Sequence, residues 1–191
     1  MPQTTAPPTL IVIDVQRAFN DPAWGARNNP DAERNVATAL AAWRERRAPV
    51  IHVRHASTAP EGLFVPGTAS FEFKPEAAPV EGEPVITKNV NSAFIGTDLE
   101  ERLQGEGVEA VALVGLVTDH CVSTTARMAG NLGFQTWVLA DATATHERRG
   151  PDGETIAAEV MHRTALASLD GEFAEVLDTS AALARLDGAT S

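Results

Sequence analysis

The chain has 191 residues, of which 43% are hydrophobic and 21% charged, so it is long enough for one sizeable buried core and one domain. Its formal net charge of -11, from 26 acidic and 15 basic residues, disfavours nucleic acid and anionic membrane surfaces as partners. The single cysteine, Cys121, excludes an internal disulfide and a cysteine-rich zinc site, which leaves a buried small hydrophobe or a reactive thiol.

We expect residues 1–8 to form a disordered tail and residues 9–187 to form a single domain. The tail has no basic region followed by an apolar run, so it lacks the pattern of a secretory signal. No stretch approaches the roughly 20 apolar residues that a membrane-spanning helix needs. We therefore expect a cytoplasmic protein without a membrane partner.

Short apolar runs rich in β-branched residues alternate along the chain with longer helical patterns. The runs lie at residues 10–13, 50–53, 85–87, 108–114 and 137–139, with a weaker one at 173–177. Such continuous apolar runs are typical of strands buried on both faces, as in a parallel sheet covered by helices. The pattern predicts a three-layer α/β fold.

Helix boundary signals lie between these runs. The first helix is expected between Asn29-Pro30-Asp31 and Ala48-Pro49. The second starts at a possible capping box of Thr97 with Glu100. The third and fourth helices are expected at about 121–132 and 154–169.

Residues 56–83, rich in proline, glycine and phenylalanine, interrupt the alternation of strands and helices. A connection longer than about 12–15 residues without secondary structure is usually functional. We expect this segment to be a lid or a subunit contact, with a partly ordered surface excursion as the alternative.

Polar residues follow or end three of the apolar runs. Asp14 follows the first run, Lys88 ends the third, and the fourth leads through Thr118, Asp119 and His120 into Cys121. Because ligands of open parallel sheets bind beyond the carboxyl ends of the strands, these side chains are candidates for one site. Each also has a structural explanation, since such residues can cap a turn, be solvated at a strand end or pack in a core.

Asp14, Lys88 and Cys121 suit acyl transfer. A nearby cation and the N-terminus of the following helix favour the thiolate of Cys121. Asp14 can accept the thiol proton, pass it to a leaving amine and then activate water. Backbone N–H groups in the turn from Thr118 to Cys121 can stabilise the oxyanion.

Several motifs in the chain resemble those of the isochorismatase-like cysteine hydrolases. They are Ile11-Val12-Ile13-Asp14-Val15-Gln16 with Phe19, Lys88 with Asn91-Ser92-Ala93-Phe94, and Gly115-Leu116-Val117-Thr118-Asp119-His120-Cys121-Val122 with Thr124, Ala126 and Arg127. The match runs from about Leu10 to Leu177, with the motifs in the family's order.

This resemblance implies a Rossmann-like, mostly parallel six-stranded sheet of order 3-2-1-4-5-6. It implies a catalytic triad of Asp14, Lys88 and Cys121, and an oxyanion hole at the N–H groups of Thr118 and Cys121. It also implies a cis peptide bond before Thr118. Finally, it suggests a homo-oligomer, either a dimer or a tetramer, in which a partner subunit can contribute to the rim of the pocket.

The resemblance favours the amidohydrolase branch of the family. Nicotinamidases carry an Asp-x-His pair and a later histidine as metal ligands, whereas here the second run ends in His52, Val53, Arg54 and His55 with no such aspartate. Two histidines without carboxylate or thiolate support are too few for zinc, so we expect no metal and no other cofactor. Isochorismatases that cleave a vinyl ether generally do not use the cysteine nucleophile, so Cys121 favours C–N hydrolysis.

Seven residues near the expected crevice are candidates for contacting a small-molecule substrate. They are Phe19, Trp24, Arg54, His55, Asn91, Phe94 and His120. Core packing is the alternative for the aromatic residues, and an ion pair with a surface acid is the alternative for Arg54. His146 and Arg148, after the fifth run, are expected at the surface or in a subunit contact.

The favoured function is hydrolysis of a C–N bond in a small amide, ureide or cyclic imide through a thioester acyl-enzyme. An isochorismatase-type vinyl ether or ester hydrolase on the same scaffold is the second hypothesis. A non-catalytic binding or interaction protein with the same fold is the third.

Overall fold

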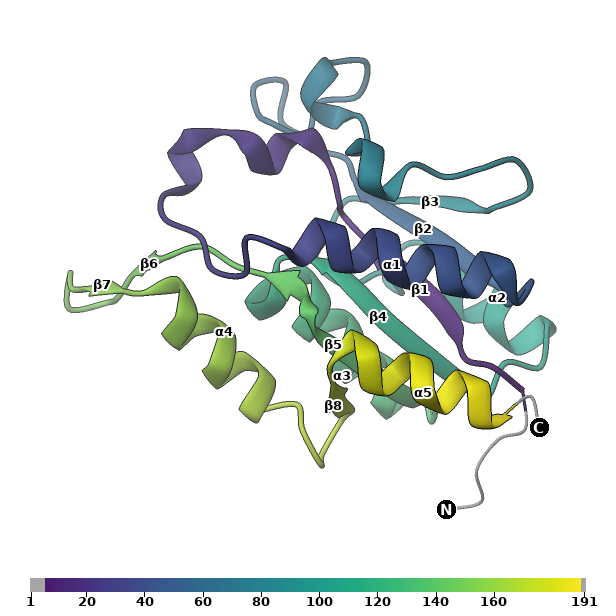
Figure 1. Cartoon of the computed structure of the whole chain (residues 1–191). Helices are drawn as coiled ribbons and strands as arrows, with labels where there is room; N and C mark the ends of the chain where they lie inside the picture. The colour runs from purple at the N-terminus through teal and green to yellow at the C-terminus, as the bar shows by residue number, and fades with distance from the viewer. Residues whose placement is uncertain (1–5, 190–191) are drawn as a thin grey trace.

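The computed structural model describes residues 6–189 and shows a three-layer α/β/α fold (Figure 1). Its six-stranded sheet has the order β3-β2-β1-β4-β5-β8, and all pairings within it are parallel. The strands are β1 (Thr9–Ile13), β2 (Val50–His55), β3 (Val85–Lys88), β4 (Ala110–Leu116), β5 (Gln135–Ala144) and β8 (Glu175–Leu177). The predicted order is confirmed, with β8 as the sixth strand of the sheet.

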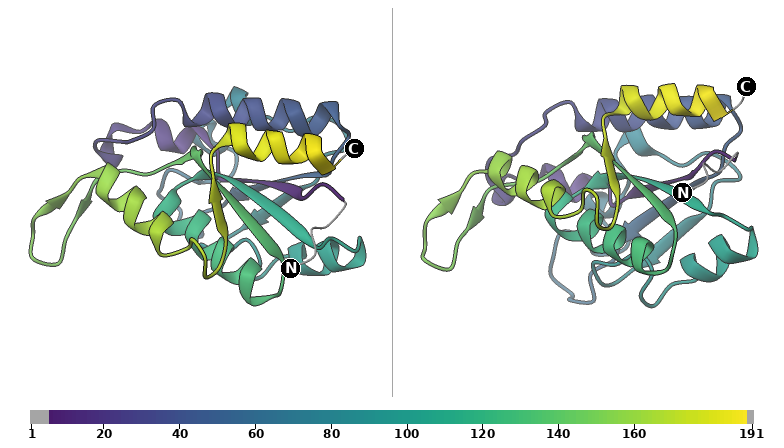
Figure 2. Two further views of the ribbon diagram at one scale, coloured as in Figure 1. Left: turned by 60° about the horizontal axis from the view of Figure 1, so that its bottom comes forward. Right: turned by 90° about the horizontal axis from the view of Figure 1, so that it is seen from below.

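Helices cover both faces of the sheet (Figure 2). One layer is α1 (Ala32–Glu45) with α5 (Thr179–Ala189), and the other is α2 (Leu99–Gly105), α3 (Ser123–Asn131) and α4 (Ala158–Ala167). Successive residues of β1 point to opposite faces, so Leu10 and Val12 pack with the first layer, while Ile11 and Ile13 pack with the second. Short 3₁₀ turns are η1 (Arg17–Asn20), η2 (Pro22–Trp24), η3 (Ala69–Phe71) and η4 (Pro75–Ala77). Within residues 6–189, no helix is long and apolar enough to cross a bilayer.

Two helices start later than the sequence pattern indicates. α4 begins at Ala158 because the preceding Thr155–Ile156 (β7) pairs antiparallel with Arg148–Arg149 (β6) in a hairpin that projects from the body (Figure 1). α3 begins at Ser123 because Thr118–Val122 forms a π-helical turn, η5. The added turn places the nucleophile candidate ahead of the regular helix.

The expected capping box at α2 is not formed. The N-cap residue is Asp98, and its side chain makes no capping hydrogen bond. The Thr97 hydroxyl instead donates to the Ala93 carbonyl at 2.6 Å, which ties the start of α2 to the loop before it.

The expected N-terminal tail lies partly outside the described residues, which exclude residues 1–5. The end of that tail is ordered, because Pro8 is buried and its carbonyl accepts a hydrogen bond from Trp43 Nε1 at 2.7 Å. The prediction of disorder is therefore wrong for Pro8.

A close contact between β1 and β4 brings the two sides of the candidate site together. Gly115 in β4 has φ of 125°, and a Cβ atom there would lie 2.0 Å from the carbonyl oxygen of Ile13. Glycine is therefore required at this position. Asp14 follows Ile13 directly, so the contact holds it beside the turn that follows β4.

The long segment from 56 to 83 folds against the carboxyl ends of β1 and β2. The side-chain amide of Gln16 donates to the Phe71 carbonyl at 2.8 Å, and the Lys74 N–H donates to the Val15 carbonyl at 2.9 Å. Both contacts fix the second half of the segment to the residues that follow β1. Whether the segment acts as a lid or as a subunit contact stays a prediction.

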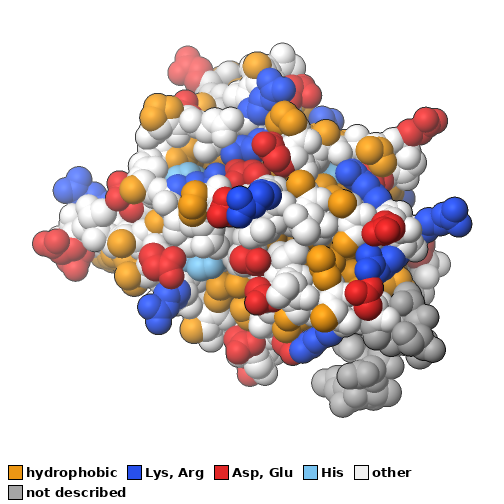
Figure 3. Space-filling model, viewed as in Figure 1, with side chains coloured by type: hydrophobic (Ala, Val, Ile, Leu, Met, Phe, Trp, Pro, Cys, Tyr) orange, Lys and Arg blue, Asp and Glu red, His pale blue; other side chains and the backbone are white. Residues whose placement is uncertain are grey.

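Three charged side chains fasten this segment to α1 and to the loop before it. Glu33 accepts hydrogen bonds from Arg27 at 2.6 and 2.7 Å and from Lys74 at 2.6 Å. Burial raises the pKa of Glu33, but the hydrogen bonds from Arg27 and Lys74 outweigh it and lower the pKa to about 2. The cluster lines a cleft of about 580 Å³. Across the face in Figure 3, acidic and basic side chains are interspersed, with no large patch of one sign.

We expect Glu33→Gln to lower the free energy of unfolding by about 1–2 kcal/mol at pH 7, less than the pKa shift alone would give because the cluster is partly exposed. The pKa of Glu33 is lower in the folded chain than its ordinary 4.5, so its contribution is complete above that pH and disappears as the pH falls towards 2. Urea unfolding at pH 7 and pH 3 measures the difference. Glu76→Gln, which changes an exposed acid of the same cleft, is the control. An equal loss at both pH values would contradict this account.

Candidate active site

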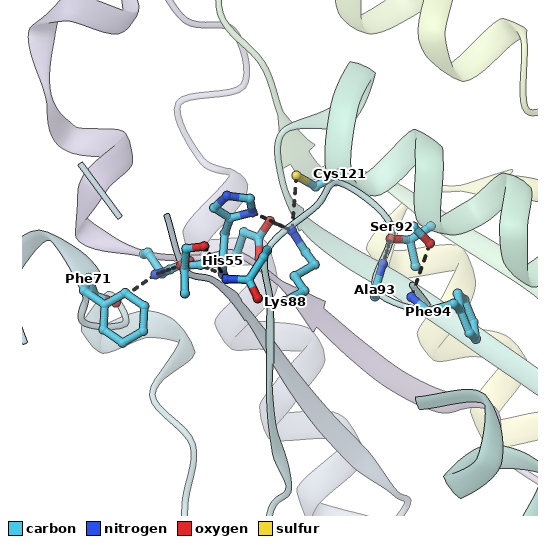
Figure 4. Close-up of polar contacts among 12 residues, drawn as sticks. His55, Phe71, Lys88, Ser92, Ala93, Phe94 and Cys121 are labelled. Carbon is cyan, nitrogen blue, oxygen red and sulfur yellow. Dashed lines mark hydrogen bonds and ion pairs between the residues drawn. The ribbon is translucent and has the colours of Figure 1, made fainter. Parts of the chain in front are cut away.

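The structure brings Asp14, Lys88 and Cys121 together at the carboxyl edge of the sheet (Figure 4). The Lys88 ammonium donates to Asp14 Oδ2 at 2.5 Å and to Cys121 Sγ at 3.4 Å. Lys88 lies on the edge strand β3, and β2 separates it from β1. Strands are spaced by ~4.8 Å, so the long lysine side chain is what allows this position to reach Asp14.

All three side chains are buried, and burial decides their protonation. Burial raises the pKa of Asp14 above the ordinary carboxyl range, although the charge of Lys88 acts in the opposite direction. Burial and the charge of Asp14 raise the pKa of the Cys121 thiol by more than Lys88 lowers it. The expected thiolate is therefore not the resting form. One buried cation favours one anion, so the resting site holds a carboxylate, an ammonium and a neutral thiol.

The Asp14 carboxylate is placed to take the thiol proton. Its Oδ2 atom is occupied by Lys88, whereas Oδ1 is buried and has no hydrogen-bond partner that meets ordinary geometry among the described residues. The thiol of Cys121 interacts with this carboxylate. Transfer of the proton from sulfur to Asp14 leaves the net charge of the site unchanged, so it avoids a second buried anion.

The nucleophile lies in the π-helical turn η5. The Val117 carbonyl accepts hydrogen bonds from the N–H groups of His120 at 3.2 Å and Val122 at 3.3 Å. The cis peptide bond joins Leu116 to Val117, one residue earlier than the sequence prediction placed it. Cys121 is buried, with 9% of the residue exposed.

Side chains from three other elements hold this turn in place. The Thr118 hydroxyl pairs with Nδ1 of the buried His162 of α4 at 2.9 Å. Asp119 accepts hydrogen bonds from the Thr145 hydroxyl and, at 3.3 Å, from Arg148 Nε. Arg148 is half-buried and supports the turn from the segment after β5, a role that the sequence analysis did not give it. Whether it also takes part in a subunit contact stays a prediction.

His55 lies beside the triad at the end of β2. Its Nδ1 atom is 3.3 Å from Lys88 Nζ (Figure 4). Its ring packs edge-on against that of Phe64, with the ring centroids 5.3 Å apart. Gln16 holds the His55 backbone from both sides, accepting from its N–H at 2.8 Å and donating to its carbonyl at 3.1 Å. His55 is thus the candidate substrate contact that touches the triad.

Four aromatic rings form a cluster next to the nucleophile turn. The ring centroid of Phe19 lies 5.1 Å from that of Trp24 and 5.2 Å from that of Phe64. The ring of His146 stacks on both Phe19 and Trp24. Phe19 also packs against Val117, just before η5. Phe19 and Trp24 therefore lie in one cluster with residues next to the nucleophile turn, and their contact with substrate stays a prediction. His146 is buried within the cluster, so its expected surface position is wrong.

The other predicted substrate contacts lie elsewhere. Arg54 donates to the Thr87 hydroxyl and stacks over Phe71, on the side of the segment from 56 to 83. Asn91 and His120 are exposed, and the nearest acid to His120 is its neighbour Asp119, at 3.6 Å.

Phe94 belongs to the core instead of the pocket wall. Its ring stacks on Phe134 with centroids 6.1 Å apart, in the layer that contains α2 and α3. An apolar residue such as Phe94 suits the wall of a pocket and the hydrophobic core equally well. Only the fold shows which of the two positions it occupies.

The two histidines of β2 point to opposite faces of the sheet because they are an odd number of residues apart. His52 is buried against Glu83, with Nε2 and Oε2 2.8 Å apart, while His55 faces Lys88. Within the described part of the chain, no group of three or more histidine, cysteine or acidic side chains has the arrangement of a metal site.

Five supporting residues were not predicted from the sequence, and only some of them could have been. Gln16 and Asp119 lie inside the motifs that hold the triad, so their neighbourhood could have indicated them. Phe64, His146 and His162 come from a loop, a strand end and a distant helix, and no spacing links them to Cys121. Only the fold brings these three to the site.

Comparison with known proteins agrees with the fold. The family model of the isochorismatase domain matches residues 8–181. YrdC of Bacillus subtilis (strain 168), an uncharacterized isochorismatase family protein, is 46% identical over 170 residues, or 89% of this chain and 91% of YrdC. Nicotinamidase 3 of Arabidopsis thaliana is 31% identical, over 88% of this chain and 83% of its own.

A solved structure is similar over the whole fold. The crystal structure of an isochorismatase-family protein from Chromobacterium violaceum superposes with a TM-score of 0.94 and is 41% identical, covering 98% of this chain and all of that one (100%). The match of the domain model, the identity to YrdC and this superposition all point to the same group. The chain therefore belongs to the isochorismatase family of hydrolases.

Proposed function

We propose that this protein hydrolyses the C–N bond of a small amide, ureide or cyclic imide through a thioester on Cys121. The observation that carries the proposal is the Lys88 ammonium in contact with both the Asp14 carboxylate and the Cys121 sulfur. A nucleophile, a proton acceptor and a cation are the groups that acyl transfer requires. The similarity to a protein named as a nicotinamidase supports an amide as the substrate class.

The first half of the reaction forms the thioester. Asp14 takes the proton from Cys121, and the thiolate that forms is stabilised by Lys88 while it attacks the carbonyl carbon. The C–N bond then breaks as Asp14 returns the proton to the nitrogen, which leaves as ammonia or an amine. Before the attack and after the C–N bond breaks, the triad carries one negative and one positive charge. In the tetrahedral intermediate Asp14 is protonated and the sulfur is bonded to carbon, so the negative charge lies on the substrate oxygen and the net charge of the site stays the same.

The second half releases the acid. Asp14, again a carboxylate, accepts a proton from water, the resulting hydroxide attacks the thioester carbonyl, and the sulfur leaves and recovers its proton. In both halves the oxyanion is held by the N–H groups of Thr118 and Cys121 in the η5 turn. The contacts of Thr118 with His162 and of Asp119 with Thr145 support this role, because they fix the turn before substrate arrives.

Ammonia release from a panel of primary amides, ureides and cyclic imides tests the proposal. Cys121→Ala serves as the blank. We expect at least one compound to be hydrolysed by the wild-type protein and none by the variant. Hydrolysis that survives in Cys121→Ala would refute the thioester route.

The alternative reaction on this scaffold is cleavage of a vinyl ether or ester. The buried Asp14, with its raised pKa, favours that alternative in one respect, since a protonated carboxyl can donate a proton to a vinyl carbon. Cleavage of a vinyl ether by protonation at carbon does not need a nucleophile, so it would persist in Cys121→Ala and stop in Asp14→Asn. Hydrolysis of an ester by acyl transfer would stop in both variants. A protein that neither turns over nor binds these compounds would be the non-catalytic member of the fold.

The activity is expected to fall at acidic pH with an apparent pKa above the ordinary carboxyl range. Asp14 must be a carboxylate to accept the thiol proton, and burial raises its pKa, so it becomes protonated and inactive at a higher pH than a solvated aspartate. Measuring kcat/KM between pH 4 and 8 gives the apparent pKa of this fall in activity. A profile that stays flat down to the ordinary carboxyl range would exclude Asp14 as the base.

A further inference from the structure

We propose that His146 binds the far end of the substrate in the aromatic cluster, so that the preferred substrates are small planar amides with a second hydrogen-bonding group opposite the scissile bond. The inference rests on the proposed function for the position of the reacting carbonyl at Cys121. It adds a residue outside the triad and defines what the rest of the substrate looks like.

The side chain of His146 is buried with one of its ring nitrogens unpaired among the described residues. It is 2% exposed, and its Nδ1 atom has no hydrogen-bond partner among the described residues. The backbone on either side is fixed: Thr145 and Asn28 pair through two hydrogen bonds, and the Glu147 N–H donates to the Ala26 carbonyl. A polar atom buried without a partner costs stability, so a phenylalanine here would serve packing alone better than histidine does.

The aromatic cluster connects His146 to the triad. The ring of His146 stacks on Phe19 and Trp24, with centroids 6.2 and 5.7 Å apart. Phe64 packs against both of these rings and, on its other side, against His55, which lies 3.3 Å from Lys88 Nζ. Aromatic surface thus runs from His146 to the residues around Cys121. Such a wall binds a planar group by stacking.

The charges around His146 indicate which polar group it meets. Burial, together with the charges of Arg27, Arg148 and Lys74, lowers the pKa of His146 to about 4, so the ring is neutral at pH 7. Arg27 Nε and Arg148 Nη2 are also buried without partners. Both are donors in every protonation state, so the group that satisfies this region is an acceptor on the ligand, such as a ring nitrogen or a second carbonyl oxygen.

Trp24 and Phe64 are the outer members of the cluster. Both are half-buried, and Phe64 belongs to the segment from 56 to 83, outside any helix or strand. Phe64 contacts both Trp24, which stacks on His146, and His55, which lies beside Lys88, so a planar ligand packed against Phe64 would lie between these two ends of the site. The segment from 56 to 83 then acts on substrate selection through Phe64.

Two variants separate a binding role from a packing role. His146→Phe keeps the planar ring and removes both nitrogens, and His146→Asn places a polar atom close to the position of Nδ1. The substrates are benzamide and the three pyridinecarboxamides, which differ from benzamide only by one ring nitrogen. We expect the wild-type protein to prefer one pyridinecarboxamide over benzamide by about tenfold in kcat/KM, since an unpaired polar site discriminates by at least that much.

His146→Phe should lose this preference and melt about 2–4 °C higher, because it removes a buried polar group without a partner. His146→Asn should retain part of the preference. A lower melting temperature for His146→Phe, or an unchanged preference, would overturn the role of His146 while leaving the thioester mechanism intact.

Failure of the proposed function gives a different result. If none of these amides is hydrolysed, the same preference is measured as the shift in melting temperature that each compound causes in the Cys121→Ala variant. A shift that favours one pyridinecarboxamide and vanishes with His146→Phe supports the site without the reaction. Equal shifts for all four compounds, or none, reject it.

Discussion

Replacing Cys121 with serine is expected to lower kcat by about 10⁴-fold or more, with a melting temperature within ~2 °C of wild type. A serine hydroxyl is far harder to deprotonate than a thiol, and the only base beside it is a carboxylate already shared with Lys88. The two side chains are nearly isosteric, so the packing of the η5 turn is kept. Steady-state hydrolysis of the best amide from the panel, together with thermal unfolding, measures both quantities.

Met128→Leu on α3 is the matched control for this experiment, because it changes a side chain that packs against the same hydrophobic cluster as Cys121 and leaves the three triad residues in place. It should keep wild-type kcat. Comparable losses in Cys121→Ser and Met128→Leu would mean that the helix, and not the sulfur, limits the reaction.

Replacing Lys88 with methionine is expected to lower the free energy of unfolding by about 3–5 kcal/mol at pH 8, because the fully buried Asp14 loses the cationic partner of its ion pair. Activity should fall by about 10²–10⁴-fold as the thiolate loses its cation. Asp14 can escape part of the stability cost by taking up a proton, so the loss should be smaller at pH 5. Urea unfolding at both pH values measures it.

The double variant Asp14→Asn with Lys88→Met distinguishes a charge effect from a packing effect. If the cost of Lys88→Met is an unpaired buried carboxylate, the double variant should be at least as stable as the single one. If its stability is lower by the sum of the two single losses, the ion pair does not hold the site as described. The activity of the double variant should remain at the level of the worse single variant.

The sheet could be predicted from the sequence because burial on both faces leaves continuous apolar runs such as 10–13 and 108–114. The positions of Asp14 and Lys88 follow from the same pattern, since a strand that ends in a charged residue places it at the ligand edge. Their order across the sheet came from family resemblance. Nothing in the spacing alone shows that Lys88 lies on the edge strand and reaches over β2.

The substrate wall was harder to predict because its residues come from loops. Phe19 and Phe94 are both aromatic and both lie just after motif residues, yet one joins the cluster beside Val117 and the other stacks on Phe134 in the core. His146 was expected at the surface or in a subunit contact, because it follows the fifth apolar run. Its burial depends on pairing between the strand end after β5 and the loop before α1, which no local pattern reveals.

The protonation of the site was the least predictable feature. Lys88 next to Cys121 indicates a thiolate when the pair is considered alone. The structure adds complete burial of Asp14 at the same point, and a second buried anion costs more than one lysine offsets. The proposed mechanism therefore activates the thiol by transfer of its proton to Asp14 and not by a lowered pKa in the resting state.

Intact-mass spectrometry of the protein quenched with acid during turnover of its best amide tests the central claim most directly. A thioester on Cys121 predicts a species heavier by the acyl group, located on the peptide that contains Cys121 and absent from Cys121→Ser. Steady product formation by an enzyme that never carries this mass, under conditions where release of the acid is rate-limiting, would contradict the account.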